Sequence, residues 1–587
     1  MKTYTADFET TTIETCEDET WVWAYGFREL YKEYSFRWGT DIDEFMQFCE
    51  SGSMKDSKMF YFHNLKFDGH FIIDYLLRSG VKWDWGYEYI DKEKTKKKKT
   101  KRKPNTFRTL ITKEGLFYSI EWIHDTNKKA VKKTIFRDSL KKLPFTVERI
   151  AKSFELPMLK GDIDYNKVRP KGYTPTDEEL DYLERDVVIM AKALEIQLEE
   201  GQTGMTIGSD SLNTFKEIIG EKTFNRLFPV LSPEDNKEIR RSYKGGFTYV
   251  NPKYRNKIIN GGKVFDVNSL YPAMMLKPMP YGHPLKFDGQ YEYNKRYPLY
   301  IQKIYCELEL KDGFIPTIQI KGNLRFKSTE YITSTKGEPV ELVLTGVDLE
   351  LMYKHYDVIE YEFRGGYMFK QVEGVFKDYI HKYMKIKEVS EGAIRELAKL
   401  LLNNLYGKFS SDTDATGKYP QLNEEGILEL VEGENEVKES IYTAVGSYIT
   451  SYARETTITA CQNNYDRFIY ADTDSLHIEG YEMPVGIDIH RTHLGKWKFE
   501  GDFIRGKFLR AKTYMEAICI DENGKDTTKE NALATKIKVT CAGMPDKLKR
   551  HVTFNNFYNG NVFEGKLKPK IVKGGVMLVE TDFTIKM

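Results

Sequence analysis

The sequence predicts a multidomain protein that combines α/β and α+β folds. At 587 residues, the chain has room for about four domain-sized units. Apolar, strand-like segments that carry acidic residues occur near the N-terminus and again in the middle and C-terminal parts of the chain. Between the later ones, residues 390–409 show a helical pattern of apolar side chains. We therefore expect two separate acidic groups, each built on strands of a different domain.

The segment 468–478, FIYADTDSLHI, is predicted to be a β-hairpin. Two apolar runs flank a tight Asp-Thr-Asp connection, so Asp472 and Asp474 share one face. Carboxylates this close raise each other's pKa unless a divalent cation neutralises both, and hard oxygen ligands suit Mg²⁺ or Mn²⁺. An ordinary acidic turn would also explain a single Asp-x-Asp, because turns favour aspartate.

A second acidic strand strengthens the metal interpretation. Residues 264–272, VFDVNSLYP, form a short apolar strand that delivers Asp266 and then leaves extended structure at Tyr271 and Pro272. Two metals about 3.5–4 Å apart can activate an attacking 3′ oxygen and stabilise a leaving pyrophosphate. We expect Tyr271 to pack beneath the incoming sugar and to exclude a 2′-hydroxyl.

Residues 390–409, SEGAIRELAKLLLNNLYGKF, are predicted to form a helix with two different faces. The apolar face comprises Ile394, Leu397, Ala398, Leu401, Leu402 and Leu405. The other face comprises Arg395, Lys399, Asn403 and Tyr406. Lys399, with Lys387 just before the helix, can neutralise phosphates, and Tyr406 can stack on a base. Taken alone, such a face could also be a solvated surface.

The N-terminal third contains the other acidic group. Asp7 and Glu9 share one face of a predicted strand, while Phe8 points into a core. Asp68 opens a predicted helix, and Tyr182 and Asp186 lie at i and i+4 of another. Four carboxylates and a phenol suit two-metal hydrolysis with water as the nucleophile. Asp-x-Glu alone would indicate only a surface pair.

Together these motifs resemble those of family B DNA polymerases, specifically the protein-primed replicases of the bacteriophage phi-29 type. Residues 266–272 are similar to motif A, 399–407 (KLLLNNLYG) to motif B and 470–475 (YADTDS) to motif C. Residues 512–514 (KTY) are similar to the Lys-x-Tyr motif that holds the primer end, and 243–246 (YKGG) to the Tyr-x-Gly-Gly element. The resemblance runs in order from about residue 3 to the C-terminus.

The resemblance implies a DnaQ-like (RNase H-like) exonuclease domain followed by a right-hand polymerase with two insertions. The implied boundaries are 1–206 for the exonuclease, 207–277 and 443–541 for the palm, 375–410 for the fingers and 542–587 for a β-rich thumb. The insertions, 278–374 and 411–442, are similar to terminal-protein regions 1 and 2. The first is expected to be rich in strands such as IQKIYCELEL and FIPTIQIK.

The resemblance also assigns residues to sites. The implied catalytic residues are Asp7, Glu9, Asp68, Asp186, Tyr182, Lys160, Asp266, Asp472 and Asp474. Two Mg²⁺ or Mn²⁺ ions per active site would be held by Asp7, Glu9, Asp68, Asp162 and Asp186 in one domain and by Asp266, Val267, Asp472 and Asp474 in the other. The implied nucleotide-binding residues are Tyr271, Lys387, Lys399 and Tyr406. The implied DNA contacts are Thr10, Asn64, Phe67, Ser139, Leu140, Phe145, Tyr165, Tyr243, Gly245, Gly246, Asn403, Gly407, Lys512 and Tyr514. Phe67, Leu140 and Phe145 would equally suit a core.

Composition limits the alternatives. The net charge is only +1, so a DNA-binding chain must concentrate its cations locally. The 39 tyrosines are compatible with surfaces that stack on bases. Six scattered cysteines without a C-x-x-C pair favour neither a zinc ribbon nor a secreted disulfide framework. No signal peptide or run of transmembrane length is evident, so we expect no membrane partner and a reducing cytoplasm.

Two charge blocks stand out. The basic run 92–103 is predicted to form a mobile loop, which either solubilises the protein or contacts DNA or a partner protein. The acidic block 424–439 is predicted to be hairpin-like and lies in the second insertion.

The expected function is viral DNA replication. We predict a DNA-directed DNA polymerase with a 3′–5′ exonuclease, processive and strand-displacing, acting in the cytoplasm of a bacterial host. Its expected partners are template-primer DNA, dNTPs and a terminal protein that serves as primer, and otherwise it would be a monomer. A nuclease or DNA-binding protein with a degenerate polymerase half is one alternative. An RNA polymerase or reverse transcriptase is another, which the exonuclease motifs and Tyr271 disfavour.

Overall fold

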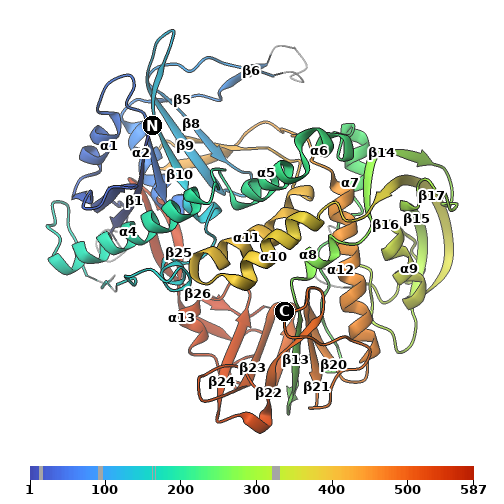
Figure 1. The fold of residues 1–587 in the computed structure, drawn as a ribbon. Helices are drawn as coiled ribbons and strands as arrows, with labels where there is room; N and C mark the ends of the chain where they lie inside the picture. Colours follow the sequence, from blue (N-terminus) through green and yellow to red (C-terminus); the bar gives the residue numbers. More distant parts are fainter. Residues whose placement is uncertain (12–17, 90–96, 162, 165–166, 320–330, 587) are drawn as a thin grey trace.

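The computed structural model describes residues 1–11, 18–89, 97–161, 163–164, 167–319 and 331–586. Two eight-stranded sheets form the cores of the N-terminal and C-terminal parts. Helices from the middle of the chain lie between these two parts (Figure 1). No helix among the described residues is both long and apolar enough to cross a membrane.

The N-terminal sheet has the strand order β3-β2-β1-β4-β10-β9-β8-β5, in which β4 runs parallel to both β1 and β10. Its core is rich in aromatic side chains. Phe8, for example, packs edge to face on Phe45 and Phe62. The strands are β1 (Lys2–Thr10), β2 (Val22–Glu29), β3 (Arg37–Gly39), β4 (Lys58–Phe62), β5 (Lys82–Trp83), β8 (Thr106–Ile111), β9 (Phe117–Thr126) and β10 (Val131–Asp138). The helices are α1 (Ile42–Glu50), α2 (Leu65–Arg78), α3 (Val147–Ser153) and α4 (Asp177–Glu199).

The second sheet has the order β11-β20-β21-β13-β22-β23-β24, and β12 pairs with β22. The strand expected at 264–267 is β13, and the expected hairpin at 468–478 is β20 and β21; both are confirmed. The strands are β11 (Thr248–Val250), β12 (Ile258–Ile259), β13 (Gly262–Val267), β20 (Phe468–Asp472), β21 (Ser475–Glu479), β22 (Trp497–Arg510), β23 (Thr513–Ile520) and β24 (Ala534–Cys541).

The middle helices include the one predicted at 390–409, which is α11 (Gly392–Phe409). It packs on α5, α10 and α12, so its buried surface is wider than one stripe. Ala393 and Leu400 are therefore buried in addition to the predicted positions, whereas Ile394 is only partly buried. The other helices are α5 (Ile207–Ile219), α6 (Glu221–Leu227), α7 (Pro233–Arg240), α8 (Leu270–Met274), α10 (Lys377–Val389) and α12 (Thr443–Asn463).

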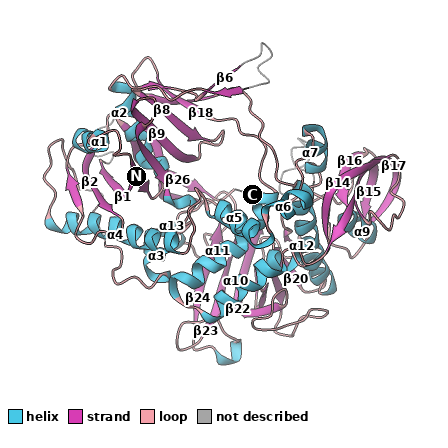
Figure 2. Ribbon diagram, turned by 45° about the horizontal axis from the view of Figure 1, so that its top comes forward, coloured by secondary structure: helices cyan, strands magenta, loops and turns pink. Residues whose placement is uncertain are grey.

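Smaller units surround this framework. A four-stranded sheet β14-β17-β15-β16 is covered by α9 (Gly346–His355). The hairpin of β18 and β19 contacts β8 of the N-terminal sheet (Figure 2), and the hairpin of β25 and β26 contacts α2. The strands are β14 (Met279–Phe287), β15 (Leu299–Leu310), β16 (Val340–Thr345), β17 (Tyr356–Val372), β18 (Lys418–Leu422), β19 (Leu428–Glu432), β25 (Val562–Val572) and β26 (Gly575–Thr584). The remaining helix is α13 (Asp546–Lys549).

Two expectations from sequence were wrong in part. Within the basic run, residues 97–99 form strand β7 (Lys97–Lys99), which pairs with β6 (Tyr87–Tyr89). Backbone pairing has overcome the charge repulsion there, and the start of the run lies outside the described residues. The segment 314–319 is not a strand. Its backbone N–H groups at Thr317 and Ile318 donate instead to the Tyr356 hydroxyl, and Pro316 has no N–H to donate.

Candidate active sites

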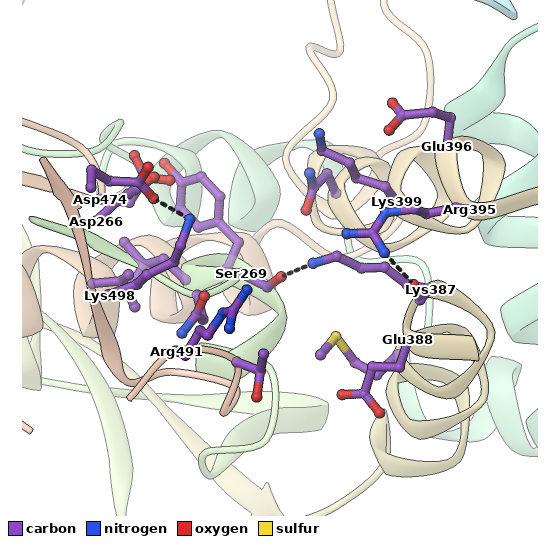
Figure 3. Close-up of a pocket in the computed structure, with 18 of the residues that line it drawn as sticks. Asp266, Ser269, Lys387, Glu388, Arg395, Glu396, Lys399, Asp474, Arg491 and Lys498 are labelled. Atoms are coloured by element: carbon purple, nitrogen blue, oxygen red, sulfur yellow. Dashed lines mark hydrogen bonds and ion pairs between the residues drawn. The ribbon is translucent and has the colours of Figure 1, made fainter. Parts of the chain in front are cut away.

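The second sheet brings Asp266 and Asp474 to one cleft. Asp266, near the end of β13, lies opposite Ser475 of β21. The N–H of Val267 donates to the carbonyl oxygen of Asp474 at 2.9 Å, so the two acidic segments are joined through their backbones. Both carboxylates line a cleft of about 840 Å³ between the sheet and α11 (Figure 3).

The electrostatics of this pair suit a cation. Burial, together with the negative charges of Asp474 and Glu500, raises the pKa of Asp266 to about 7. Burial and Asp472 raise the pKa of Asp474 to about 6. Oδ1 of Asp266 is buried and has no hydrogen-bond partner among the described residues. A buried, unpartnered carboxylate oxygen is a good ligand for a hard divalent cation.

Asp472 is arranged differently. Its Oδ1 accepts from the Thr248 hydroxyl at 2.9 Å and lies 3.7 Å from Nζ of Lys512. Its Oδ2 accepts from the Tyr470 hydroxyl at 3.3 Å. Asp472 is absent from the residues that line the cleft, although Val267 is among them. Within the described part of the chain, no three acidic, histidine or cysteine side chains form a compact metal-binding group.

The predicted polar face of α11 faces this pair. Arg395, Lys399, Asn403 and Tyr406 all line the cleft. Lys387, in α10, donates from Nζ to the Ser269 hydroxyl at 3.3 Å (Figure 3). Burial lowers the pKa of Lys387, and the nearby positive charges of Lys399 and Arg395 lower it further. Cations this crowded would be stabilised by a polyanion such as a triphosphate.

The loop at 243–246 is held against the hairpin tip. Two carbonyl oxygens, those of Lys244 and Gly245, each accept from Nη1 of Arg454 at 2.8 Å. Gly246 lies against Thr473, because an added Cβ would be 2.7 Å from the Thr473 hydroxyl oxygen. In contrast, added Cβ atoms at Gly245 and Gly407 would meet open space. The close contact with Thr473 therefore explains why residue 246 is a glycine. The surfaces at Gly245 and Gly407 are open and could accept a ligand.

The Lys-x-Tyr segment packs on the same hairpin. The N–H of Lys512 donates to the Tyr470 hydroxyl at 3.0 Å. The ring of Tyr514 lies 4.8 Å from that of Tyr470 and stacks on Phe508. Neither Lys512 nor Tyr514 lines the 840 Å³ cleft, so this segment marks a neighbouring surface.

The N-terminal acidic residues also gather. Burial and Asp186 raise the pKa of Asp7 to about 7. Burial and Asp7 raise the pKa of both Glu9 and Asp68. Burial is the larger cause in each case, and the smaller electrostatic contribution indicates that these carboxylates lie within range of one another. Oδ1 of Asp68 and Oδ1 of Asp186 are buried without a hydrogen-bond partner among the described residues, so this site also fits a cation.

Lys160 and Tyr182 belong to the same group. Nζ of Lys160 donates to Oδ2 of Asp186 at 2.7 Å and lies 5.2 Å from the centre of the Tyr182 ring. Burial raises the pKa of Asp186, and its contacts with Lys160 and Tyr182 oppose the rise. The structure thus brings together the carboxylates, the phenol and the lysine predicted from sequence. Asp162 lies outside the described residues.

The predicted DNA contacts of this domain lie around two polar side chains. Oδ1 of Asp138 accepts from the N–H groups of Asn64 and Leu140. The His63 ring contacts the Ser139 hydroxyl at 3.1 Å and the Phe145 carbonyl at 2.7 Å. Ser139 is buried and its hydroxyl donates to the Phe62 carbonyl. Its side chain is therefore poorly accessible to a ligand.

The other predicted contacts of this domain differ in accessibility. Asn64 is exposed, and Phe67, Leu140 and Phe145 are partly exposed. Thr10 is also partly exposed, and its carbonyl accepts from the Trp23 indole at 3.1 Å. Tyr165 lies outside the described residues.

Sequence reasoning missed part of the 840 Å³ cleft. Lys498 and Glu500 of β22 line it and form an ion pair at 2.8 Å, and Arg491 and Thr492 line it from the preceding loop. Lys498 and Glu500 alternate along the strand, and this alternation of charges on one face is the signal that could have identified them.

An acidic pair on a central sheet, faced by a cationic helix across a cleft, defines a right-hand polymerase. The chain belongs to the family of type B DNA polymerases of organelles and viruses, whose family model matches residues 49–491. It is a DNA-directed DNA polymerase, and the predicted family and fold class are confirmed.

Two relatives and one solved structure define its position in the family. The chain is 48% identical to the DNA polymerase of Bacillus phage Nf, with 100% of both chains covered. It is also 48% identical to that of Bacillus phage phi29, covering 100% of this chain and 99% of the relative. The phi29 DNA polymerase solved with primer-template DNA and incoming nucleotides matches with a TM-score of 0.92 and 47% identity, over 100% of each chain.

Proposed function

We propose that this protein replicates viral DNA from a protein primer, displaces the non-template strand and proofreads its product. The observation that carries the polymerase assignment is the Asp266–Asp474 pair facing Lys399 across one cleft. The solved phi29 structure with primer-template DNA and nucleotides supports the same ligands for this cleft. The similarity of this chain to the DNA polymerases of Bacillus phages supports action inside a bacterial host.

In the polymerase site, Asp266, Asp474 and the Val267 carbonyl would hold two Mg²⁺ or Mn²⁺ ions, with Asp472 nearby. The bound ions would neutralise charge that develops on the phosphate oxygens and lower the pKa of the primer 3′-hydroxyl. Lys387 and Lys399 bind the triphosphate from the fingers side. Tyr271 packs beneath the sugar and Tyr406 stacks on the base.

The primer is held by other residues of the chain. Lys512 and Tyr514 bind its end, and their contacts with Tyr470 keep that end next to the acidic hairpin. Tyr243, Gly245, Gly246, Asn403 and Gly407 contact the template strand or the duplex.

In the N-terminal site, Asp7, Glu9, Asp68 and Asp186 would hold a second pair of ions for 3′–5′ hydrolysis. Tyr182 and Lys160 orient and stabilise the attacked phosphate. The unpartnered oxygens of Asp68 and Asp186 support this assignment, because a bound cation would satisfy them.

One experiment tests the two activities together. Labelled primer-template is incubated with Mg²⁺, with and without dNTPs. We expect extension with dNTPs and shortening of the primer without them. Shortening under both conditions would instead indicate a nuclease with a degenerate polymerase half.

Strand displacement is supported by the second insertion. Its hairpin of β18 and β19 contacts the N-terminal domain in two places. Nζ of Lys113 lies 3.3 Å from Oε1 of Glu432, and the ring centroid of Tyr419 lies 5.3 Å from those of Trp83 and Trp85. The thumb contacts the same domain where the N–H of Thr20 donates to the Lys573 carbonyl at 2.9 Å. A hairpin and a thumb that both contact the N-terminal domain would keep the two DNA strands apart and slow dissociation.

Protein priming is supported by the first insertion. It carries interleaved charges such as Glu307, Glu309 and Lys311, which suit a reversible, salt-sensitive interface. The same insertion also carries the cations Lys321, Arg325 and Lys327, which lie outside the described residues. The test is transfer of dAMP to the cognate terminal protein in the absence of a DNA primer. Failure of transfer while DNA-primed extension persists would remove this part of the proposal.

A further inference from the structure

The loop that leads into β22 adds a cation to the polymerase cleft from the palm side. Arg491 lines the cleft with Ser269 and Lys387. Figure 3 shows it beside Ser269, on the opposite side from Lys387 of the fingers. Arg491 is exposed, and no hydrogen bond or ion pair joins it to another residue of the described chain.

This loop is fixed to the strand that carries Asp266. The N–H of Asn268 donates to the Lys496 carbonyl at 2.9 Å, and the N–H of Gly495 donates to the Asn268 carbonyl at 2.9 Å. The Asn268 amide also donates to the His490 carbonyl at 2.9 Å. The residue before Arg491 is thus tied directly to the segment between Asp266 and Ser269.

The turn that carries Arg491 is itself braced. Nδ1 of His490 accepts from the N–H groups of Thr492 at 3.1 Å and His493 at 3.0 Å. The His490 and His493 rings stack with centroids 3.5 Å apart. Because the turn is held in this way, Arg491 loses little backbone freedom when its side chain binds an anion, which favours affinity.

A second palm cation serves as a contrast. Lys498 lies opposite Asp266 in the sheet register, but it is already paired with Glu500 at 2.8 Å. Arg491 has no such carboxylate, so its guanidinium remains available for a ligand. A guanidinium binds phosphate oxygens in a two-pronged manner that a lysine cannot reproduce.

We propose that Arg491 binds the triphosphate of the incoming nucleotide, and then the departing pyrophosphate, from the palm side of the cleft opposite Lys387. This inference rests on the proposed nucleotide site. A triphosphate is favoured over a primer phosphate because Lys512 and Tyr514, the expected primer contacts, do not line this cleft.

The test compares Arg491→Ala and Arg491→Lys with Lys496→Ala as the matched control. Lys496 lies in the same loop, pairs with Asp488 and is not among the residues that line the cleft. The measurements are dNTP affinity in single-nucleotide insertion, inhibition by inorganic pyrophosphate, and primer-template affinity as a function of salt. Thermal unfolding checks that each variant folds, and Arg491→Gln replaces the alanine variant if that one does not.

For Arg491→Ala we expect dNTP affinity and pyrophosphate inhibition to weaken about tenfold, as for loss of one charge-assisted hydrogen bond. Arg491→Lys should recover part of the loss, and Lys496→Ala should match the parent. Unchanged dNTP affinity would overturn the inference, and so would a loss confined to primer-template affinity. If Asp474→Ala still extended primers, the proposed nucleotide site itself would fail, which is a separate outcome.

Discussion

The rings of Tyr271 and Tyr406 stack on each other, with centroids 4.1 Å apart and planes inclined by 25°. Tyr271 lies in α8, just after the strand of Asp266, and Tyr406 ends the cleft-facing side of α11. Burial, with a smaller contribution from neighbouring tyrosines, raises the pKa of both phenols, so both are neutral at physiological pH. The pair forms an uncharged wall of the cleft where α8 and α11 meet.

The Tyr271–Tyr406 pair predicts that the protein selects deoxyribonucleotides over ribonucleotides. Tyr271→Val should raise incorporation of ribonucleotides relative to deoxyribonucleotides by about tenfold or more, because the space of the 2′-hydroxyl is no longer filled. Single-nucleotide kinetics with matched rNTP and dNTP pairs measure the ratio. Tyr406→Phe keeps the stacked ring and serves as the control. Unchanged discrimination in Tyr271→Val would contradict the steric role.

The two acidic sites should be separable. The double variant Asp7→Ala, Glu9→Ala should lose primer degradation and keep extension, since its carboxylates belong to the N-terminal sheet. Asp474→Ala should lose extension and keep degradation. Gel assays with and without dNTPs report both activities, and circular dichroism checks folding. Loss of both activities in either folded variant would refute the assignment of two sites.

The acidic pairs and the polar face of α11 were predictable because they depend on local periodicity. Asp472 and Asp474 flank a tight turn, and Arg395, Lys399, Asn403 and Tyr406 recur at helical spacing. The orientation of Asp472 was not predictable, since Thr248 and Lys512 hold it from distant segments. Arg491 reaches the cleft because Asn268 holds the loop before β22, and sequence periodicity does not reveal contacts between such distant segments.

Removing metal should expose a pH dependence of stability. Because the pKa of Asp266 is raised to about 7, the folded protein binds more protons than the unfolded chain between its ordinary pKa of about 4 and pH 7. The contribution of Asp266 to the free energy of unfolding therefore falls as the pH rises from about 4 to 7. In a chelator at pH 8, Asp266→Asn should increase the free energy of unfolding by about 1–2 kcal/mol.

Denaturant titrations across pH measure this difference, which should shrink as the pH approaches about 4. Adding Mg²⁺ to the parent should recover stability at pH 8. The exposed Asp288 provides the control, and Asp288→Asn should have little effect. An Asp266→Asn variant that is less stable than the parent at pH 8 without metal would show that the carboxylate is not strained.

The last prediction concerns the hairpin of the second insertion. Tyr419 lies 5.3 Å from both Trp83 and Trp85 between ring centroids, and the two tryptophans are 4.3 Å apart. An added Cβ at Gly433, just beyond β19, would lie 2.5 Å from the Trp85 ring. Aromatic pairs contribute about 0.5–1.5 kcal/mol each beyond their buried area, so Trp85→Ala should let the hairpin detach from the N-terminal domain more often.

If this contact keeps the hairpin in place against the displaced strand, Trp85→Ala should shorten products on a primed double-stranded minicircle and leave single-nucleotide insertion unchanged. Trp38→Ala is the matched control, because Trp38 is similarly exposed in the same domain, at 45% against 40% for Trp85. Product length on a primed single-stranded circle separates strand displacement from processivity, since only the first needs the strands to be parted. Parent-like products on both circles would mean that the aromatic contact does not hold the hairpin in its working position.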